Sequence, residues 1–285
     1  LKTGEKYPCS EWLYLILMQY KESPGDKNGK KGSEESITVM TLNMAHARKG
    51  TSNGTTNKKN RIENNLNHIV KVITHEHPLV VALQEADGET YRPDNFNQVE
   101  FISEKAKYPY IETGYHVIKK NFVYGTALLS LYPLSHTEMT TFLPSPPTPL
   151  KGFVVSRMKW PFPSWNKEVD VISLHLDFLR KHVRMKQVEQ IIQKLKTRGK
   201  PLIVMGDFNC EPDIRENTLQ YFCENLNLKM YNPYSVELVT FQLFKKRLDW
   251  ILISPDFEFK SYRVLKDKIS DHSGVIAEIA VRKQS

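Results

Sequence analysis

Polar side chains that can bind a metal ion or a phosphate stand at the ends of several short apolar runs. Asn43 closes ITVMTLN, Glu85 closes VVALQE and His175 lies in VISLHLD. Later, PLIVMGDFN ends with two such residues, LDWILIS carries one near its start, and SDH precedes the last apolar run. Because loops at strand ends are where a rigid scaffold holds reactive groups, these positions form one candidate set. Its members are Asn43, Glu85, His175, Asp207, Asn209, Asp249, Asp271 and His272.

The chemistry of this set is that of phosphate-ester hydrolysis at a divalent cation. A single Asp or Asn at a strand end more often makes a cap or a turn. Several together differ, because the carboxylates of Glu85, Asp207, Asp249 and Asp271 would repel one another unless a cation or a histidinium neutralised them. Oxygen ligands from Glu and Asn, without cysteine, suit Mg²⁺ or Mn²⁺ better than Zn²⁺. The sequence therefore predicts a divalent-metal-dependent phosphoesterase.

The same residues carry a resemblance to a known family. The motifs LN ending at 43, QE at 85, LH at 175, GDFN at 206–209, LDWI at 248–251 and SDH at 270–272 resemble, in this order, those of the endonuclease/exonuclease/phosphatase superfamily, whose members are deoxyribonuclease I-like. GDFN and SDH are the most specific. The resemblance covers about residues 37–281, and the polar insert at residues 47–60 departs from compact members.

The resemblance implies a role for each residue of the metal and water sites. Glu85 resembles the principal metal ligand, with Asn43 beside it and Asp271 completing the site or binding a second ion. Asp207 and Asn209 resemble the pair that positions the attacking water and binds the phosphate. Their two-residue spacing puts both on the same side of an extended chain. The bound Mg²⁺ or Mn²⁺ would polarise a phosphoryl oxygen.

The resemblance also implies roles for two histidines. His272 resembles a histidine paired with a carboxylate, here Asp249, which fixes its tautomer and raises its pKa for general acid-base or electrostatic work. His175 resembles the residue that donates to a phosphate oxygen in the transition state. Four more residues flank the motifs and are weaker candidates for substrate contact, because a surface arginine or a strand tyrosine usually has a structural role. They are His46, Arg48, Tyr124 and Arg157.

The elements that must position these residues alternate between short β-rich runs and a few helices. Apolar positions at helical spacing predict helices over residues 62–75 and 181–196. So many strands with so few helices favour two sheets packed face to face over one doubly wound parallel sheet. The expected fold class is α/β: a four-layer α/β/β/α sandwich of two mostly antiparallel sheets with helices outside.

A polar, Lys- and Gly-rich stretch at residues 20–36 divides the chain. It predicts an N-terminal segment and flexible connection over residues 1–35, followed by one catalytic domain over residues 36–285. Residues 11–19 are short enough to be either a strand or a helix. No apolar run reaches the roughly 20 residues that span a bilayer. We expect a soluble protein. The chain begins at Leu1 rather than Met, so export after removal of a leader is one alternative, and the compartment is left open.

The substrate is the least constrained part of the prediction. The net charge of +8 and the pI near 9.2 favour polyanionic partners, although they also serve solubility. A nuclease-like phosphodiesterase is favoured by basic residues in the first loop, Lys49, Lys58, Lys59 and Arg61. A phospholipid or sphingomyelin headgroup is the alternative if aromatics of KWPFPSW, residues 159–165, touch a membrane.

Two further alternatives are an inositol-phosphate phosphatase and a binding module with a relic site, although no motif position is replaced. Specificity is expected in the loops at residues 47–60, 87–98, 144–152 and 231–239. The three cysteines, Cys9, Cys210 and Cys223, show no CxxC spacing and indicate neither a disulfide framework nor a zinc site. No protein partner can be inferred.

Overall fold

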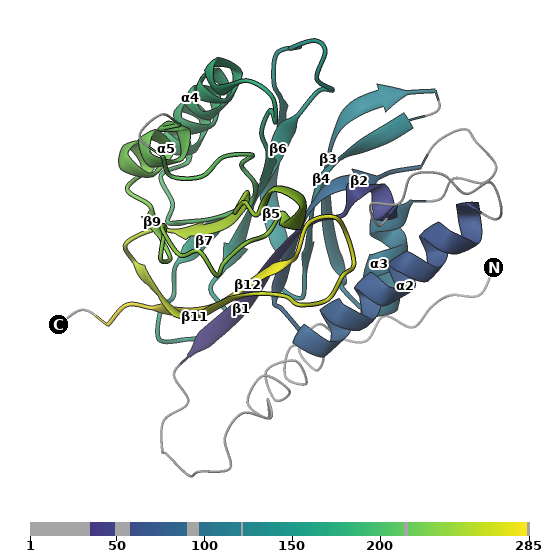
Figure 1. Cartoon of the computed structure of the whole chain (residues 1–285). Coiled ribbons are helices and arrows are strands. Elements are labelled where there is room, and N and C mark those ends of the chain that lie inside the picture. The colour runs from purple at the N-terminus through teal and green to yellow at the C-terminus, as the bar shows by residue number, and fades with distance from the viewer. Residues whose placement is uncertain (1–34, 49–57, 90–96, 121, 214–215, 284–285) are drawn as a thin grey trace. The chain divides into compact units, whose positions relative to one another are not determined.

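Two six-stranded sheets form the centre of the protein in the computed structural model (Figure 1). The structure describes residues 35–48, 58–89, 97–120, 122–213 and 216–283. The first sheet has the order β11-β12-β1-β2-β4-β3 and the second the order β5-β6-β7-β8-β10-β9. The strands are β1 (Ser36–Asn43), β2 (Val80–Asp87), β3 (Tyr110–Lys119), β4 (Phe122–Ser130), β5 (Leu134–Thr141), β6 (Gly152–Lys159), β7 (Glu168–His175), β8 (Leu202–Asp207), β9 (Lys229–Met230), β10 (Asp249–Ile253), β11 (Phe257–Val264) and β12 (Val275–Val281).

Each sheet contains one parallel pair among antiparallel ones. The parallel pairs are β1 with β2 in the first sheet and β7 with β8 in the second. Every other neighbouring pair is antiparallel. The expectation of two mostly antiparallel sheets is therefore confirmed.

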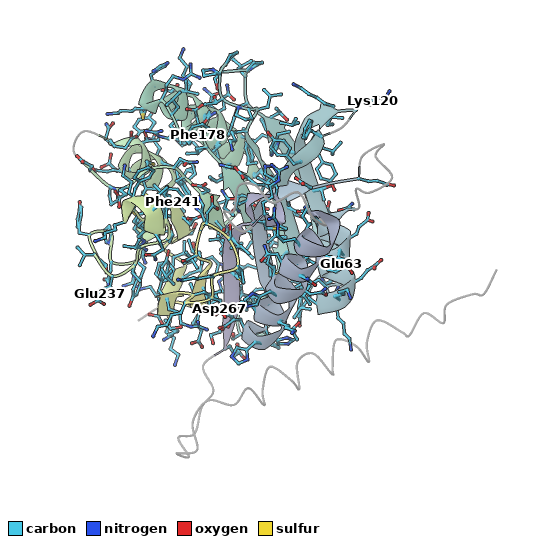
Figure 2. The ribbon with its side chains drawn as sticks, turned by 45° about the vertical axis from the view of Figure 1, so that its right-hand side comes forward. Glu63, Lys120, Phe178, Glu237, Phe241 and Asp267 are labelled. Carbon is cyan, nitrogen blue, oxygen red and sulfur yellow. The ribbon has the colours of Figure 1, made fainter. Side chains whose placement is uncertain are left out.

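Helices cover the outer faces of both sheets. In Figure 1, α2 (Lys58–Glu76) and α3 (Gln98–Ala106) lie on one side and α4 (Lys181–Arg198) and α5 (Thr218–Leu226) on the other. The predicted apolar face of α4 is buried at every position, and Val188, its isoleucines and its leucine join the same core cluster as β7 and β8. α4 ends because Gly199 takes the left-handed conformation that glycine adopts without strain. Figure 2 labels Glu63 on α2 and Lys120 at the far end of the β3–β4 hairpin.

The inner faces of the two sheets pack against each other through apolar side chains and a few buried hydrogen bonds. Gln84 of β2 donates to the Ser173 hydroxyl of β7 (3.0 Å), and that hydroxyl donates to the Leu83 carbonyl (2.9 Å). Buried polar groups need such partners, so these bonds fix how the sheets meet. The four-layer α/β/β/α arrangement is thus the observed one.

Residues 36–285 form one compact unit. The predicted N-terminal segment, including residues 11–19 and Cys9, lies outside the described residues. Cys210 and Cys223 are buried free thiols, and burial raises both pKa values. Within the described part of the chain, none of the helices combines the length and the apolar character needed to cross a membrane.

Candidate active site between the two sheets

The motif residues meet at one edge of the two sheets because both parallel pairs end there. Asn43 closes β1 opposite Gln84 of β2, and His175 closes β7 opposite Asp207 of β8. Asp249 opens β10 in register with Asp207. Gly206, just before Asp207, has φ of 150°, and a Cβ there would lie 2.1 Å from the Leu174 carbonyl oxygen. Glycine therefore lets these two strands approach at the site.

Asp207 lies at the centre of the group and joins the sheets. Its carboxylate accepts a hydrogen bond from the Asn43 side-chain amide at 2.9 Å, across the space between β1 and β8. His175 Nε2 lies 3.4 Å from the same oxygen, and His272 Nε2 lies 3.9 Å from it. Burial and the nearby charge of Asp249 raise the pKa of Asp207 to about 7. A carboxyl group with such a pKa can take up or release a proton near neutral pH.

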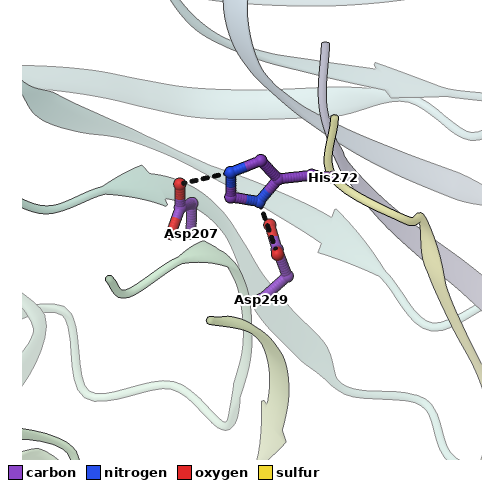
Figure 3. Close-up of side chains that lie close together, drawn as sticks. All are labelled: Asp207, Asp249 and His272. Atoms are coloured by element: carbon purple, nitrogen blue, oxygen red, sulfur yellow. Dashed lines mark hydrogen bonds and ion pairs between the residues drawn. The ribbon is translucent and has the colours of Figure 1, made fainter. Parts of the chain in front are cut away.

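His272 and Asp249 form a buried pair beside Asp207 (Figure 3). The Nδ1 atom of His272 lies 2.8 Å from an Asp249 carboxylate oxygen. Burial opposes protonation of the imidazole, but the carboxylates of Asp249 and Asp207 outweigh it and raise the pKa of His272 to about 10. The ring is therefore an imidazolium at neutral pH. The second Asp249 oxygen is buried and has no hydrogen-bond partner among the described residues.

Glu85 reaches the site through a bulge in β2. The register between β2 and β4 shifts between Gln84 and Ala86, and Glu85 between them has φ of 49°. A bulge redirects one side chain out of the regular alternation of a strand. Burial opposes ionisation of Glu85, but the charges of Lys151 and His46 outweigh it and lower its pKa. Glu85 is thus a carboxylate, and it is partly open to solvent, with 24% of its side chain exposed.

Lys151 is a residue of the site that the motifs do not mark. Its side chain is only 5% exposed, and its ammonium lies 3.3 Å from Glu85 Oε1 and 2.9 Å from His175 Nε2. Burial and this ammonium together hold the pKa of His175 well below its ordinary value, so the ring is neutral. The sequence placed Lys151 only within a specificity loop, residues 144–152. The one available signal was its position directly before a strand that pairs with the His175 strand.

The loop that carries Lys151 is held by a buried carboxylate. Asp177 accepts hydrogen bonds from the hydroxyls of Thr148 and Ser145 and from the backbone amides of Leu179 and Arg180. Burial opposes ionisation of Asp177, but these donors outweigh it and lower its pKa. The loop after β7 and the loop before β6 therefore share one anchor beside the site.

Two predicted residues take positions that differ from the expectation. β8 ends at Asp207, and Asn209 lies in a turn with φ of 53° rather than in an extended chain. There its backbone amide donates to Asp207 (2.9 Å) and its side-chain amide to the Leu176 carbonyl (3.1 Å). Asp271 is exposed and accepts a hydrogen bond from Ser270 (3.1 Å). Among the described residues it makes no hydrogen bond or ion pair to a motif side chain.

Of the weaker candidates, His46 and Tyr124 lie at the site and Arg157 does not. His46 Nε2 is 3.6 Å from Glu85, Nδ1 is 2.5 Å from Asp87, and the ring packs edge-on against Tyr124. Arg48 is exposed, and its positive charge opposes the rise that burial causes in the pKa of Tyr124. Arg157 instead pairs with buried Asp170 (3.1 Å), near the start of β7 and far along that strand from His175. Its work is structural.

The donors of the site fit a hard divalent ion. Asp207, Asp249 and His272 present ligand atoms within 4.8 Å of one another, but the imidazolium already balances charge there. Glu85 is more accessible, and the Oδ1 atom of Asn43 accepts a bond only from the Ala45 backbone amide (3.0 Å) among the described contacts, which leaves a lone pair. Carboxylate and amide oxygens without thiolate suit Mg²⁺ or Mn²⁺. Glu85 and Asn43 are the residues that would hold the ion.

The protein has two packed mixed sheets that are covered by helices, and carboxylates, amides and histidines gather at one edge of them. This arrangement defines the class of phosphoester hydrolases that are built on such a sandwich. The model of the endonuclease/exonuclease/phosphatase family matches residues 40–272. The chain belongs to this family, as its motifs indicated. Comparison with curated proteins gives no match.

Solved structures with similar folds include an endonuclease/exonuclease/phosphatase from Beutenbergia cavernae, 18% identical, with a TM-score of 0.69 over 87% of this chain and 72% of that one. The human nocturnin catalytic domain with bound sulfate is 20% identical, with a TM-score of 0.67 over 88% of this chain and 96% of that one. A mannosyl-6-phosphatase from Bacteroides thetaiotaomicron is 17% identical, with a TM-score of 0.65 over 86% of this chain and all of that one. At these identities the likeness establishes the shared fold.

Proposed function

We propose that this protein is a Mg²⁺- or Mn²⁺-dependent phosphoesterase that cleaves its substrate by direct attack of water. The observation that carries the proposal is the convergence of Asn43 and Glu85 from one sheet with His175, Asp207 and Asp249 from the other. Buried carboxylates cluster in this way where a cation and an anionic substrate balance them.

The phosphoryl group of the substrate would be bound by Lys151 and His175. The Lys151 ammonium is buried and already faces two site residues, so it supplies a fixed positive charge without reorganisation. Neutral His175 has one ring N–H to donate, because its low pKa keeps the other nitrogen unprotonated. Both groups would stabilise the charge that grows on phosphoryl oxygens in the transition state.

The attacking water would be positioned by Asp207. Its carboxylate is held from two sides, by the Asn43 side chain and the Asn209 backbone amide. A pKa of about 7 suits a group that accepts the proton of the water. The role of Asn209 is therefore chiefly to orient Asp207.

The His272 imidazolium, oriented by Asp249, would lie beside the phosphoryl group and provide a proton or a positive charge for the leaving oxygen. A divalent ion bound at Glu85 and Asn43 supplies Lewis-acid polarisation of the phosphoryl group. Asp271 remains a proposal for a second ion, supported by its place next to His272 in the chain and not by any contact to Glu85.

The test is hydrolysis of bis(p-nitrophenyl) phosphate, DNA, RNA and phosphorylated lipids by metal-free protein to which Mg²⁺ or Mn²⁺ is added back. We expect activity that EDTA abolishes and either metal restores. In H₂¹⁸O, the label is expected in the phosphate product. His272→Ala should lose about 10²-fold or more of the turnover. His75→Ala, at an exposed histidine of α2, is the matched control and should match wild type.

Equal inactivity of the wild type and both variants on every substrate, with metal present and the fold intact, would overturn this proposal. The binding module with a relic site would then be the better description.

A further inference from the structure

Among the described residues, nearly all large apolar side chains that face solvent lie at the same edge as the candidate site. Within the described residues, those that are mostly exposed range from 50% to 87% exposed. Met139, in the middle of strand β5, is the single exception to their placement. The others are Ile118, Phe122, Leu143, Phe178, Leu179, Tyr234, Val236, Leu243 and Phe244, which together are called the apolar rim.

Strand direction puts these residues at the edge. Phe178 and Leu179 follow directly after β7, which ends at His175. Leu243 and Phe244 belong to the short helix η2 (Gln242–Phe244), whose preceding residue Phe241 bridges to His272. The first pair therefore lies close to His175 in sequence, and the second pair lies close in sequence to the residue that bridges to His272.

The remaining members leave from the same edge on other strands. Ile118 and Phe122 flank the β3–β4 turn, and Tyr124 near the start of β4 lies opposite Asp87 at the end of β2. Leu143 follows β5, whose end pairs with Gly152 opposite His175. Tyr234 and Val236 follow β9, which runs antiparallel to β10 toward Asp249. The rim is thus assembled from separate loops around one polar centre.

Basic residues accompany three of the apolar pairs. The sequence reads Ile-Lys-Lys at residues 118–120, Phe-Leu-Arg-Lys at 178–181 and Leu-Phe-Lys-Lys at 243–246. Lys119, Lys120, Lys245 and Lys246 are exposed, and Lys120 projects from the outer end of its hairpin in Figure 2. An apolar tip flanked by lysine is the combination that enters an anionic bilayer surface, where the side chain buries in the lipid and the ammonium meets headgroups.

We propose that the apolar rim docks this protein on an anionic membrane surface, and that its substrate is the phosphoester of a lipid headgroup. The second half of this inference rests on the proposed function, because the rim surrounds the residues assigned there. Docking would bring the headgroup phosphates of the bilayer to Lys151 and His175. The bilayer would lie across the loops, and the polar centre would stay open toward it.

Nucleic acid fits the rim less well. Single-stranded bases bind by stacking on aromatic rings, and more than half of the rim side chains are aliphatic, with no ring to offer. Of the four basic residues that favoured a nuclease, Lys49 lies outside the described residues, and Lys58, Lys59 and Arg61 belong to the first turn of α2. The KWPFPSW segment that was the alternative membrane contact is instead packed. Trp160 is 2% exposed and stacks on Phe257, which Trp165 also contacts.

The experiment is co-sedimentation of the full chain with phosphatidylcholine vesicles, with and without phosphatidylserine. We expect binding that needs the anionic lipid and weakens as NaCl is raised. The double variants Phe178→Ser/Leu179→Ser and Leu243→Ser/Phe244→Ser should each lower the vesicle partition coefficient by about tenfold or more. Lys245→Glu/Lys246→Glu should lower it by removing the charge attraction. Met139→Ser, an exposed apolar residue off the rim, is the matched control and should bind as wild type.

Hydrolysis is measured on the same proteins with soluble bis(p-nitrophenyl) phosphate and with lipid phosphoesters embedded in the vesicles. The rim variants should keep the soluble activity within about twofold, since none of these side chains is assigned a catalytic role, and lose the vesicle activity. Soluble activity without vesicle binding would overturn the docking proposal and leave the proposed function standing.

Two other results would also contradict the inference. Vesicle binding through the rim, with no hydrolysis of any substrate, would overturn the lipid-substrate half and the proposed function together. Oligonucleotide binding that is lost in the rim variants, with no vesicle binding, would make the edge a nucleic-acid surface instead.

Discussion

Lys151 is the positive charge nearest to Glu85 and His175 in this structure, and it has two effects at once. It neutralises the Glu85 carboxylate, and it keeps His175 unprotonated. A divalent ion bound at Glu85 would meet the repulsion of this ammonium, whereas an anionic phosphoryl group would be attracted by both charges. In the proposed mechanism, Lys151 would therefore favour binding of substrate and metal together over binding of metal alone.

A Lys151→Met variant separates these effects. We expect kcat/KM on a soluble diester to fall by about 10²-fold or more, because a preorganised charge at the phosphoryl group is lost. We expect affinity for Mn²⁺, measured by calorimetry on the free protein, to stay equal or tighten, because the competing charge is gone. Unchanged kcat/KM, or Mn²⁺ binding weakened in parallel with activity, would contradict the role given to Lys151. Lys105→Met, at an exposed lysine of α3, is the control.

The identities of the principal site residues are readable from the sequence, but their neighbours are not. Motif order alone predicted Asn43, Glu85 and Asp207 as members of one candidate set, because several polar side chains at the ends of apolar runs indicate strands that end at the same place. Lys151 was missed because one lysine in a proline-rich loop has no pattern. Arg157 was a false candidate, since a strand arginine near a motif in sequence lies several residues along the strand from it in space.

At the scale of elements, Asp177 ties two loops to the site. It is fully buried and its carboxylate accepts bonds from both the loop before β6 and the loop after β7. The loop before β6 carries Lys151, so the position of that ammonium depends on this anchor. Asp177 is therefore a positioning residue.

Asp177→Ala should destabilise the protein by about 2–4 kcal/mol, because it leaves several buried donors unsatisfied. The lowered pKa gives the sign with pH: the stabilisation is present above the unfolded-state pKa and is lost as the pH falls through the folded-state pKa. The difference in melting temperature between wild type and variant should therefore narrow in acid. Asp267→Ala, at an exposed aspartate, should change stability by less than about 0.5 kcal/mol. A difference that grows in acid would contradict this account.

Element positions were predictable where periodicity is strong. The helices expected at residues 62–75 and 181–196 are α2 and α4, and the apolar runs that carry the motifs coincide with β1, β2, β7, β8, β10 and β12. The bulge at Glu85 was not predictable, because a single residue with positive φ leaves no trace in an apolar run. The turn at Asn209 was not predictable for the same reason. The expectation that Asp207 and Asn209 lie on the same side of an extended chain therefore does not hold there.

At the scale of the whole molecule, the site exists only because two sheets face each other. Asn43 and Asp207 are 164 residues apart in sequence and 2.9 Å apart at their side chains. Strand content and motif order were sufficient to predict the sandwich, since few folds bury so many strands with so few helices. Which loops would carry exposed apolar tips was not readable, because apolar residues in loops look alike until burial separates them.

The domain division remains a prediction at this scale. Residues 36–285 form one compact unit, so a fragment of these residues should unfold in one cooperative transition and retain hydrolysis of a soluble diester. Calorimetry and the activity assay check it. Two separate transitions, or a fragment that is folded but inactive, would show that residues 1–35 contribute to the catalytic unit.

We propose one metal-dependent hydrolytic site between the sheets, with Glu85 as its principal metal ligand. Its most direct test is turnover of a soluble phosphodiester at saturating Mg²⁺ by Glu85→Gln, with Glu104→Gln at an exposed glutamate of α3 as the control. We predict that Glu85→Gln loses about 10³-fold of kcat while melting near the wild-type temperature, because the ion is no longer held at the phosphoryl group. Full Mg²⁺-dependent turnover by Glu85→Gln would contradict the account.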